Sequence, residues 1–190
     1  MSDYFVHESS YVDEGAEIGD GTKIWHFSHI MKDSKIGKSC NLGQNVVISP
    51  GVVLGDRCKV QNNVSVYTGV ICEEGVFLGP SCVFTNVINP RSLIEKKDEY
   101  KKTLLKKGAS VGANATIICG NTIGRFSLIG AGAVITKDVG DYEIVVGNPA
   151  RKIGYACECG ETLKKEQNEY KCRNCGKIYV TENNILREKE

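Results

Sequence analysis

The fold is decided by a stretch in which an aliphatic residue returns every six positions: Ile36-Gly37-Lys38-Ser39-Cys40-Asn41-Leu42-Gly43-Gln44-Asn45-Val46-Val47-Ile48. The same spacing runs from Val12 to Phe84 and resumes from Val111 to Ile135, and sixteen of these eighteen positions are Ile, Leu or Val. The residues two positions earlier are mostly small or β-branched. A period of six fits neither an α-helix nor a long strand, so it predicts very short strands joined by tight corners.

Three such strands make one triangular coil of eighteen residues, and the repeats account for about six stacked coils, each about 4.8 Å from the next. The sequence therefore predicts an all-β parallel solenoid over residues 1–155. Residues 87–110 interrupt the repeat and contain a charge run, so they are expected to form a loop that leaves the solenoid. Residues 156–190 lack the repeat and are expected to form a small separate tail.

Composition excludes several classes of protein. The 190 residues include 24 Lys and Arg against 23 Asp and Glu, a balance that disfavours a dedicated nucleic-acid or anionic-membrane partner. The absence of a long apolar run predicts no membrane span. The N-terminal Met-Ser-Asp-Tyr-Phe-Val-His-Glu is too polar for a signal peptide. We therefore expect a cytoplasmic protein whose nine cysteines are thiols or metal ligands rather than disulfides.

The cysteines fall into two classes. Cys40, Cys58, Cys72 and Cys82 occupy the inward positions of the repeat, where they are expected to be inert core residues, and Cys119 is expected at a corner. The other four form a Cys-x-Cys pair and a Cys-x-x-Cys pair, which resemble the knuckles of a zinc ribbon: Cys157, Cys159, Cys172 and Cys175. Four thiolates satisfy a structural Zn²⁺ completely, and a metal-free ribbon is the alternative.

Three later stretches resemble the CoA-binding half of hexapeptide-repeat acyltransferases: residues 107–117, 128–139 and 146–154, the last with Gly147-Asn148-Pro149-Ala150-Arg151. The resemblance implies a left-handed parallel β-helix, a homotrimer, and acetyl-CoA bound between neighbouring subunits. Backbone N–H groups at glycine-rich corners and nearby cations suit the phosphates of CoA. The residues expected to hold it are Ala113, Gly130, Ala131, Lys137, Pro149, Arg151 and Lys152.

Residues 24–30, 42–46, 61–67 and 77–91 together resemble nucleotide-amino-sugar N-acetyltransferases. The branch most similar acetylates the 3-amino group of a UDP-linked amino-sugar uronate, in the synthesis of surface polysaccharide or glycan precursors. A dTDP-3-amino or UDP-4-amino deoxyhexose is the alternative substrate. The residues expected to contact the nucleotide sugar are Asn45, Asn63, Tyr67 and Arg91.

Catalysis requires a neutral amine to attack the thioester, which positioning and hydrogen bonds to the oxyanion can promote. Asn86 stands just before the excursion and is predicted to orient the amine, although a left-handed corner residue is the alternative interpretation. His26 and His29 are the histidines inside the predicted repeat and the candidate general bases. Because His26 and Asn86 are more than three coils apart, they are expected to meet only across a subunit interface.

The sequence leaves three other interpretations. A γ-type carbonic anhydrase shares the solenoid but needs three histidines on one metal, and His7 is expected to lie outside the repeat. A serine O-acetyltransferase would be expected to carry a helical N-terminal domain, which this sequence lacks. A zinc-ribbon scaffold or binding protein is the non-enzyme hypothesis, and the Gly147–Arg151 signature argues against it.

Overall fold

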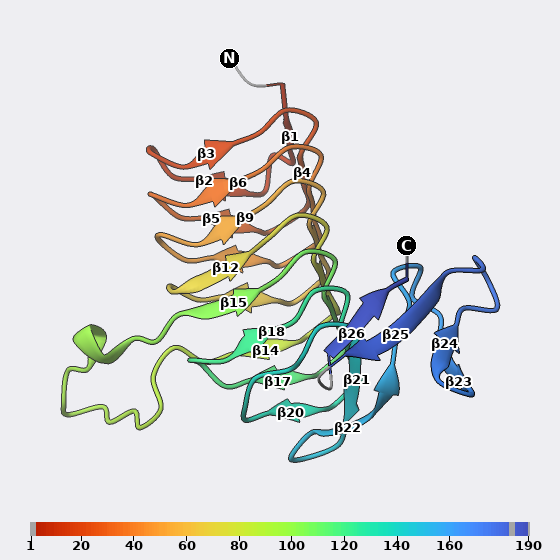
Figure 1. Ribbon diagram of the computed structural model, residues 1–190. Helices are drawn as coiled ribbons and strands as arrows, with labels where there is room; N and C mark the ends of the chain where they lie inside the picture. The colour runs from red at the N-terminus through yellow and green to blue at the C-terminus, as the bar shows by residue number, and fades with distance from the viewer. Residues whose placement is uncertain (1–2, 183–184, 190) are drawn as a thin grey trace.

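The computed structural model describes residues 3–182 and 185–189, and it shows a parallel β-solenoid with a loop on one side and a small sheet at the C-terminal end (Figure 1). Two-residue and three-residue strands stack into three flat faces, which confirms the all-β solenoid predicted from the six-residue spacing. Sheet 1 contains eight parallel strands and a final antiparallel one: β1 (Phe5–Val6), β4 (Lys23–Ile24), β7 (Asn41–Leu42), β10 (Lys59–Val60), β13 (Phe77–Leu78), β16 (Ser110–Val111), β19 (Leu128–Ile129), β21 (Glu143–Val146) and β22 (Arg151–Tyr155).

The other two faces are entirely parallel. Sheet 2 contains β2 (Tyr11–Val12), β5 (His29–Ile30), β8 (Val47–Ile48), β11 (Ser65–Val66), β14 (Val83–Phe84), β17 (Thr116–Ile117) and β20 (Val134–Ile135). Sheet 3 contains β3 (Glu17–Ile18), β6 (Lys35–Ile36), β9 (Val53–Leu54), β12 (Val70–Cys72), β15 (Thr103–Leu105) and β18 (Thr122–Ile123). Partners in register between parallel strands are eighteen residues apart outside the excursion, as in His29 with Val47, except at the last step of sheet 1, where Leu128 pairs with Ile144. We call the turns from sheet 1 to sheet 2 the first corner, and those from sheet 2 to sheet 3 the second corner.

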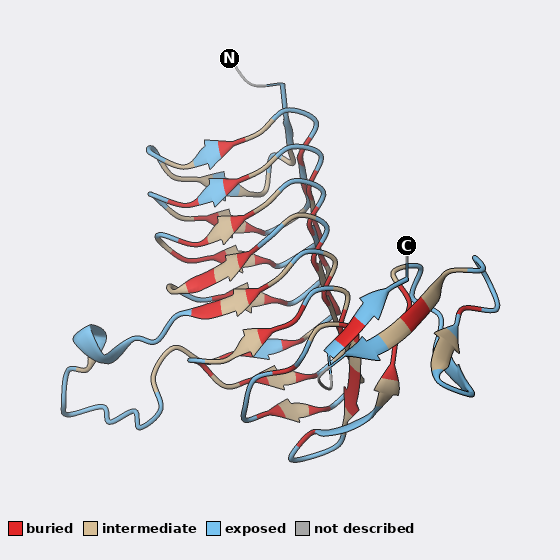
Figure 2. Ribbon diagram, viewed as in Figure 1, coloured by how far each residue is buried: buried red, intermediate tan, exposed pale blue. Residues whose placement is uncertain are grey.

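The core is a column of side chains inside the three sheets. Every residue of the predicted six-residue series is buried except Val12 near the N-terminal end, which is half-buried. Figure 2 shows that buried segments recur coil after coil along the stack. Cys40, Cys58, Cys72 and Cys82 are each about as buried as their aliphatic neighbours. Burial raises the pKa of Cys82 to about 12, so this thiol stays protonated and behaves as a small hydrophobe.

The solenoid is longer than the repeat count of about six coils. Strand β1 adds a coil before Val12, and β21 extends sheet 1 beyond Ile135. His7 directly follows β1 and so lies within the solenoid, contrary to the expectation from the sequence. Val6, six positions before Val12, continues the spacing in this coil and packs partly buried against the core.

The excursion is shorter than residues 87–110. Strand β15 pairs with β12 and β18, so the solenoid has already resumed at Thr103. The neck of the loop is closed by a hydrogen bond from the Lys101 N–H to the Asn86 carbonyl, at 2.9 Å. Beyond this neck the loop contains one short 3₁₀ helix, η1 (Lys97–Glu99), and it projects from the solenoid (Figure 1).

The tail forms a four-stranded antiparallel sheet at the C-terminal end of the solenoid: β23 (Lys164–Glu166), β24 (Glu169–Lys171), β25 (Ile178–Glu182) and β26 (Ile185–Glu188). It follows directly on β22, which pairs antiparallel with β21 of the solenoid. Among residues 3–182 and 185–189, no helix has the length and hydropathy needed to cross a membrane.

Candidate active site

The first corner carries His26 in an aromatic environment. The His26 ring stacks on His7 with centroids 3.5 Å apart, and the neighbouring Trp25 donates its Nε1–H to Asn41 Oδ1 at 2.9 Å. A cavity of about 290 Å³ opens here, lined by Trp25, His26, Asn41, Gly43, Gln44, Gln61 and Asn62. An aromatic ring beside four amides offers stacking and hydrogen bonding to a polar ring. Sequence reasoning missed this combination, because its members come from three different coils.

Further along the first corner lie Asn45 and Asn63, two predicted substrate residues. Their φ values are 57° and 61°, in the left-handed region that Asn tolerates better than most residues. The Asn45 Nδ2 donates to Asn63 Oδ1 at 3.1 Å, which links two coils. Corner geometry and this link account for both asparagines without a ligand, and both remain exposed.

His29 lies in strand β5 of sheet 2, which follows the corner that carries His26. Its Nε2 is 2.8 Å from Asp13 Oδ1, while Asp13 Oδ2 accepts the Lys32 N–H at 3.2 Å. The hydrogen bond from His29 holds the pKa of Asp13 below its usual value, so the carboxylate stays ionised. An ionised carboxylate fixes the ring proton on Nε2 and leaves Nδ1 as the acceptor in the neutral imidazole. This is the arrangement of an oriented base, and both side chains are about 40% exposed.

Asn86 and Tyr67 lie at the second corner, directly after strands β14 and β11. Asn86 is half-buried and is absent from the positive-φ residues of the described chain, so the left-handed interpretation does not hold for it. The register of sheet 2 places His29, Val47, Ser65 and Val83 in one column. Asn86 therefore lies three coils from His29, about 14 Å along the stack. One chain does not bring the predicted catalytic residues together.

The predicted CoA residues gather at the C-terminal end of the solenoid. Ala113, Gly130 and Ala131 lie at the first corner of the last coils, and Pro149 lies in the turn between β21 and β22. Lys137 and Lys152 both line a cavity of about 350 Å³ at the open end of the core, with Ile135, Val145 and Ala150 among its other walls. Lys152 Nζ binds Glu143 Oε1 at 2.8 Å. Arg151 is exposed beside this cavity but is not among its lining residues.

Gly130 has a packing role of its own. A Cβ added there would lie 2.7 Å from Val146 Cγ1, so the close approach of two coils alone favours glycine. Arg91 lies far from these groups in sequence, on the exposed excursion, and its guanidinium donates to the Pro90 carbonyl at 3.0 Å. The role of Arg91 as a contact for a carboxylate or phosphate stays a prediction.

The four tail cysteines form a cluster small enough for all four sulfurs to bind one metal ion. Their Sγ atoms all lie within 4.8 Å of one another, with 3.4 Å between Cys157 and Cys175 and 3.5 Å between Cys159 and Cys172. Zn–S bonds of about 2.3 Å would set the sulfurs about 3.8 Å apart, so small movements suffice to hold the ion. The Glu161 N–H and then the Asn174 amide lower the pKa of Cys159 to about 6, which favours a thiolate. The donor set fits a metal ion.

Within the described part of the chain, this is the only group of His, Cys, Asp and Glu with metal-binding geometry. His7 and His26 stack together, whereas His29 is engaged with Asp13. The three-histidine metal site of a carbonic anhydrase is therefore not formed by the residues described here.

Comparisons with known proteins match the repeat. A model named hexapeptide repeat of succinyl-transferase matches residues 35–68 and 107–137, and a model named bacterial transferase hexapeptide (six repeats) matches residues 15–50. The dTDP-3-amino-3,6-dideoxy-alpha-D-galactopyranose 3-N-acetyltransferase of Aneurinibacillus thermoaerophilus is 45% identical over 89 residues, which are 47% of this chain and 46% of that protein. The serine acetyltransferase of Bacillus subtilis (strain 168) is 30% identical over 118 residues, 62% of this chain and 44% of that protein.

The chain thus spans less than half the length of these two curated relatives. Among solved structures, the acetyltransferase domain of PglB from Neisseria gonorrhoeae FA1090 in complex with acetyl coenzyme A matches with a TM-score of 0.53 and 23% identity. That match covers 79% of this chain and 57% of the other. At this identity the likeness concerns the fold. The repeat matches and the observed stack of coils together show that the chain is a hexapeptide-repeat β-solenoid.

Proposed function

We propose that this chain transfers the acetyl group of acetyl-CoA to the amino group of a nucleotide-linked amino sugar. The observation that carries the proposal is the 45% identity over 89 residues to an N-acetyltransferase of a dTDP-3-amino sugar. The solenoid scaffold shared with an acetyl-CoA-bound acetyltransferase domain supports the same donor. In the reaction the neutral amine forms a C–N bond to the acetyl carbon, the C–S bond breaks, and CoA leaves as the thiolate that ends protonated.

The sugar is proposed to be a dTDP-3-amino deoxyhexose rather than a UDP-linked uronate. The relative at 45% identity acts on a dTDP-3-amino-3,6-dideoxy sugar, which has no carboxylate. A uronate would need a cation at the sugar, and the predicted candidate, Arg91, is exposed and bound to the carbonyl of its own loop. Asn45, Asn63 and Tyr67 are retained as candidate sugar contacts.

His29 is the proposed general base, and Asn86 is proposed to orient the amine. Support for His29 comes from the 2.8 Å contact with Asp13, which leaves Nδ1 free to accept a proton. His26 is stacked on His7 beside the cavity with Trp25, and it is proposed to contact the nucleotide rather than to take a proton. Lys137, Arg151 and Lys152 are proposed to bind the phosphates of CoA, with Ala113, Gly130, Ala131 and Pro149 along its length.

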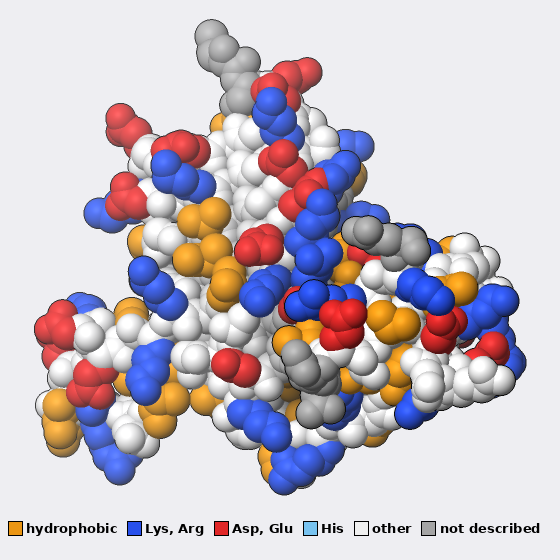
Figure 3. Space-filling model, viewed as in Figure 1, with side chains coloured by type: hydrophobic (Ala, Val, Ile, Leu, Met, Phe, Trp, Pro, Cys, Tyr) orange, Lys and Arg blue, Asp and Glu red, His pale blue; other side chains and the backbone are white. Residues whose placement is uncertain are grey.

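A homotrimer is proposed because the outward residues within the strands of sheet 2 include no Lys, Arg, Asp or Glu. Its outward residues are Tyr11, His29, Val47, Ser65, Val83, Thr116 and Val134, whereas sheet 3 carries Glu17 and Lys35 in its first two strands and Val53, Ile71, Leu104 and Thr122 beyond them. Tyr11 is 75% exposed and Val83 is 47% exposed, so apolar side chains face outward at two separate coils of this sheet. Figure 3 is a view onto sheet 3, where charged side chains lie over the upper coils. Light scattering that finds only monomers would contradict the trimer.

The tail cluster is proposed to hold one structural Zn²⁺ through Cys157, Cys159, Cys172 and Cys175. Its four thiolates leave no open position, so the ion has no place for a substrate. Metal analysis of protein produced with ample zinc tests this directly.

The activity is tested by thiol release from acetyl-CoA with a panel of acceptors: a dTDP-3-amino-3,6-dideoxyhexose, a UDP-3-amino uronate, a UDP-4-amino deoxyhexose and L-serine. We expect the highest kcat/KM with the dTDP-linked 3-amino sugar. Preference for the UDP-3-amino uronate would reverse the choice of sugar. Thiol release with L-serine alone, or with none of the four, would contradict nucleotide-sugar acetylation altogether.

A further inference from the structure

The tail and the end of the solenoid share one hydrophobic core. A cluster separate from the main core contains Tyr142, Tyr155, Cys157, Leu163, Cys172, Tyr179 and Leu186, with Phe126 and Tyr170 packed against it. Phe126 and Tyr142 belong to the last coils, Tyr155 ends β22, and the remaining residues belong to the tail. Tyr142 meets Tyr179 edge-on with centroids 5.4 Å apart. The tail is therefore packed onto the solenoid through two of its metal-binding cysteines and their neighbours.

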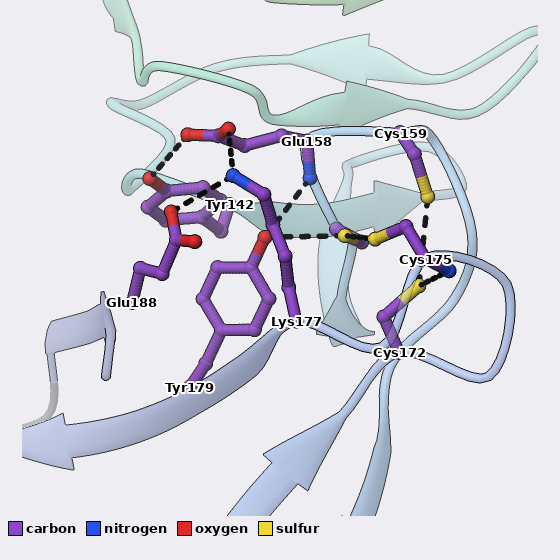
Figure 4. Close-up of polar contacts among 9 residues, drawn as sticks. Tyr142, Glu158, Cys159, Cys172, Cys175, Lys177, Tyr179 and Glu188 are labelled. Atoms are coloured by element: carbon purple, nitrogen blue, oxygen red, sulfur yellow. Dashed lines mark hydrogen bonds and ion pairs between the residues drawn. The ribbon is translucent and has the colours of Figure 1, made fainter. Parts of the chain in front are cut away.

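Polar contacts cross the same junction (Figure 4). The fully buried Tyr179 hydroxyl accepts the Glu158 N–H at 3.3 Å and lies 3.1 Å from Cys157 Sγ. With its acceptor position used by this N–H, the hydroxyl is free to donate its proton to the cysteine sulfur. The Glu158 carboxylate accepts hydrogen bonds from the Tyr142 hydroxyl at 3.2 Å and from Lys177 Nζ at 2.7 Å. Glu158, next to two cysteines, thus ties the last coil to the tail sheet.

The same junction contacts strand β22, which also pairs with β21. Tyr155, two residues before Cys157, packs edge-on against Tyr170 of β24 with centroids 5.2 Å apart. Lys152 of β22 lies over the Tyr155 ring, with Nζ 3.9 Å from the centroid, and it also lines the cavity at the end of the solenoid. Lys152 is thus held from two sides, by Glu143 of β21 at 2.8 Å and by the Tyr155 ring, and Tyr155 in turn packs against the tail.

We propose that Zn²⁺ bound by the four cysteines is a clamp that fixes the tail on the last coils and thereby holds β22, with Lys152, at the end cavity. Small domains with so little core usually need a metal or disulfides to stay folded. The ion would join Cys157, which adjoins β22, to Cys172 and Cys175, which precede β25. The part of this inference that concerns acyl-donor affinity rests on the proposed function, whereas the clamp itself does not.

The test compares wild-type protein with the double variant Cys172→Ser, Cys175→Ser, and uses Cys119→Ala as a matched change of a cysteine outside the cluster. Zinc content, hydrogen exchange of residues 143–155 and thermal unfolding are measured on each. We expect the wild type to hold about one Zn²⁺ per chain and the double variant to hold none. Exchange should accelerate in the tail and in β21–β22 but not in β4–β12. The KM for acetyl-CoA should rise about tenfold with a smaller change in kcat.

Chelation of wild-type protein repeats the comparison without a mutation, in case the double variant does not fold. Faster exchange confined to the tail would overturn the clamp on β22. Mass spectrometry that finds disulfides in place of zinc, between Cys157 and Cys175 or Cys159 and Cys172, would overturn the metal site. If no acceptor is acetylated yet exchange in β22 follows zinc, the clamp stands and the proposed function fails.

Discussion

His29 and Asp13 lie on neighbouring coils and face each other across sheet 2, with His29 Nε2 2.8 Å from Asp13 Oδ1. The contact is diagonal, because Tyr11 rather than Asp13 is the register partner of His29. It gives one of the two candidate bases a fixed ring orientation, whereas the His26 ring is stacked on His7.

Asp13→Asn should lower kcat about 10- to 100-fold and leave the KM for acetyl-CoA unchanged, because the amide no longer fixes the proton on Nε2. His29→Ala should cost about 100- to 10,000-fold and flatten the acid limb of the pH profile. Glu17→Gln is the matched control, because Glu17 Oε1 lies 2.9 Å from Lys35 Nζ on the neighbouring coil of sheet 3. Steady-state kinetics against pH check all three. Near-native rates for His29→Ala would mean that the amine is deprotonated without this histidine.

The contact between His29 and Asp13 also makes the stability of the folded protein depend on pH. The pKa of Asp13 is lowered in the folded protein, first by the hydrogen bond from His29, so the ionised carboxylate stabilises the fold. That contribution is present above the unfolded pKa of about 4 and is lost as the pH falls through the folded pKa. The difference in Tm between wild type and Asp13→Asn should therefore be visible at pH 6 and shrink toward pH 3. A difference that stays constant over this range would show that the carboxylate charge is not involved.

Gly112 is expected to tolerate no side chain, because an added Cβ would lie 2.5 Å from the Ala131 nitrogen and 2.7 Å from the Ile129 oxygen. Both are backbone atoms of the next coil, so Gly112→Ala should destabilise the protein by about 2–4 kcal/mol. Gly130→Ala meets a movable Val146 methyl and should cost less. Gly154→Ala, with open space around it, is the control. Denaturant unfolding ranks the three, and equal midpoints would contradict the close coil spacing.

Phe27 adopts φ of 57° at the first corner, a conformation unfavourable for a bulky side chain, and its ring is 63% exposed. Phe27→Asn should raise stability by about 1 kcal/mol, since asparagine tolerates this region. The converse change at the corresponding corner, Asn114→Phe, should lower it by a similar amount, as Asn114 has φ of 56°. Thermal unfolding measures both. If Phe27→Asn is destabilising, the exposed ring must make contacts in the assembled protein.

The repeat could be predicted from sequence because each inward position must be apolar whatever its coil. Leu105 is in phase with Val111, and β15 could have been found from it, but the charge run before it masked the return of the pattern. The last coil is harder to predict from the sequence. Strand β21 ends the parallel stack and the chain turns back as β22, which interrupts the six-residue spacing.

The site was less predictable than the fold. The eighteen-residue coil places Asp13 and His29 on neighbouring coils. It does not specify the side-chain rotamers that bring the two residues into contact. The four-cysteine cluster could be predicted from the sequence, because its two closely spaced cysteine pairs resemble the knuckles of a zinc ribbon. The packing of Tyr155 and Tyr179 at the junction was not, because the tail has no repeat that relates it to the solenoid.

The last prediction concerns His29 and Asn86, which one chain holds three coils apart and which we propose to meet across a subunit interface. If each site takes His29 from one subunit and Asn86 from its neighbour, His29→Ala and Asn86→Ala homotrimers should both be impaired. Asn86→Ala should lose about 10- to 1000-fold, as single positioning groups do in acyl transfer. Co-expression of the two variants in equal amounts should rebuild an intact site wherever the right subunits adjoin. Random assembly gives about one quarter of sites with both native residues, and so about a quarter of wild-type kcat at unchanged KM. Mixing the two purified homotrimers without exchange of subunits is the control and should restore nothing. If the co-expressed trimers keep only the residual rate of the homotrimers, the two residues do not act in one shared site.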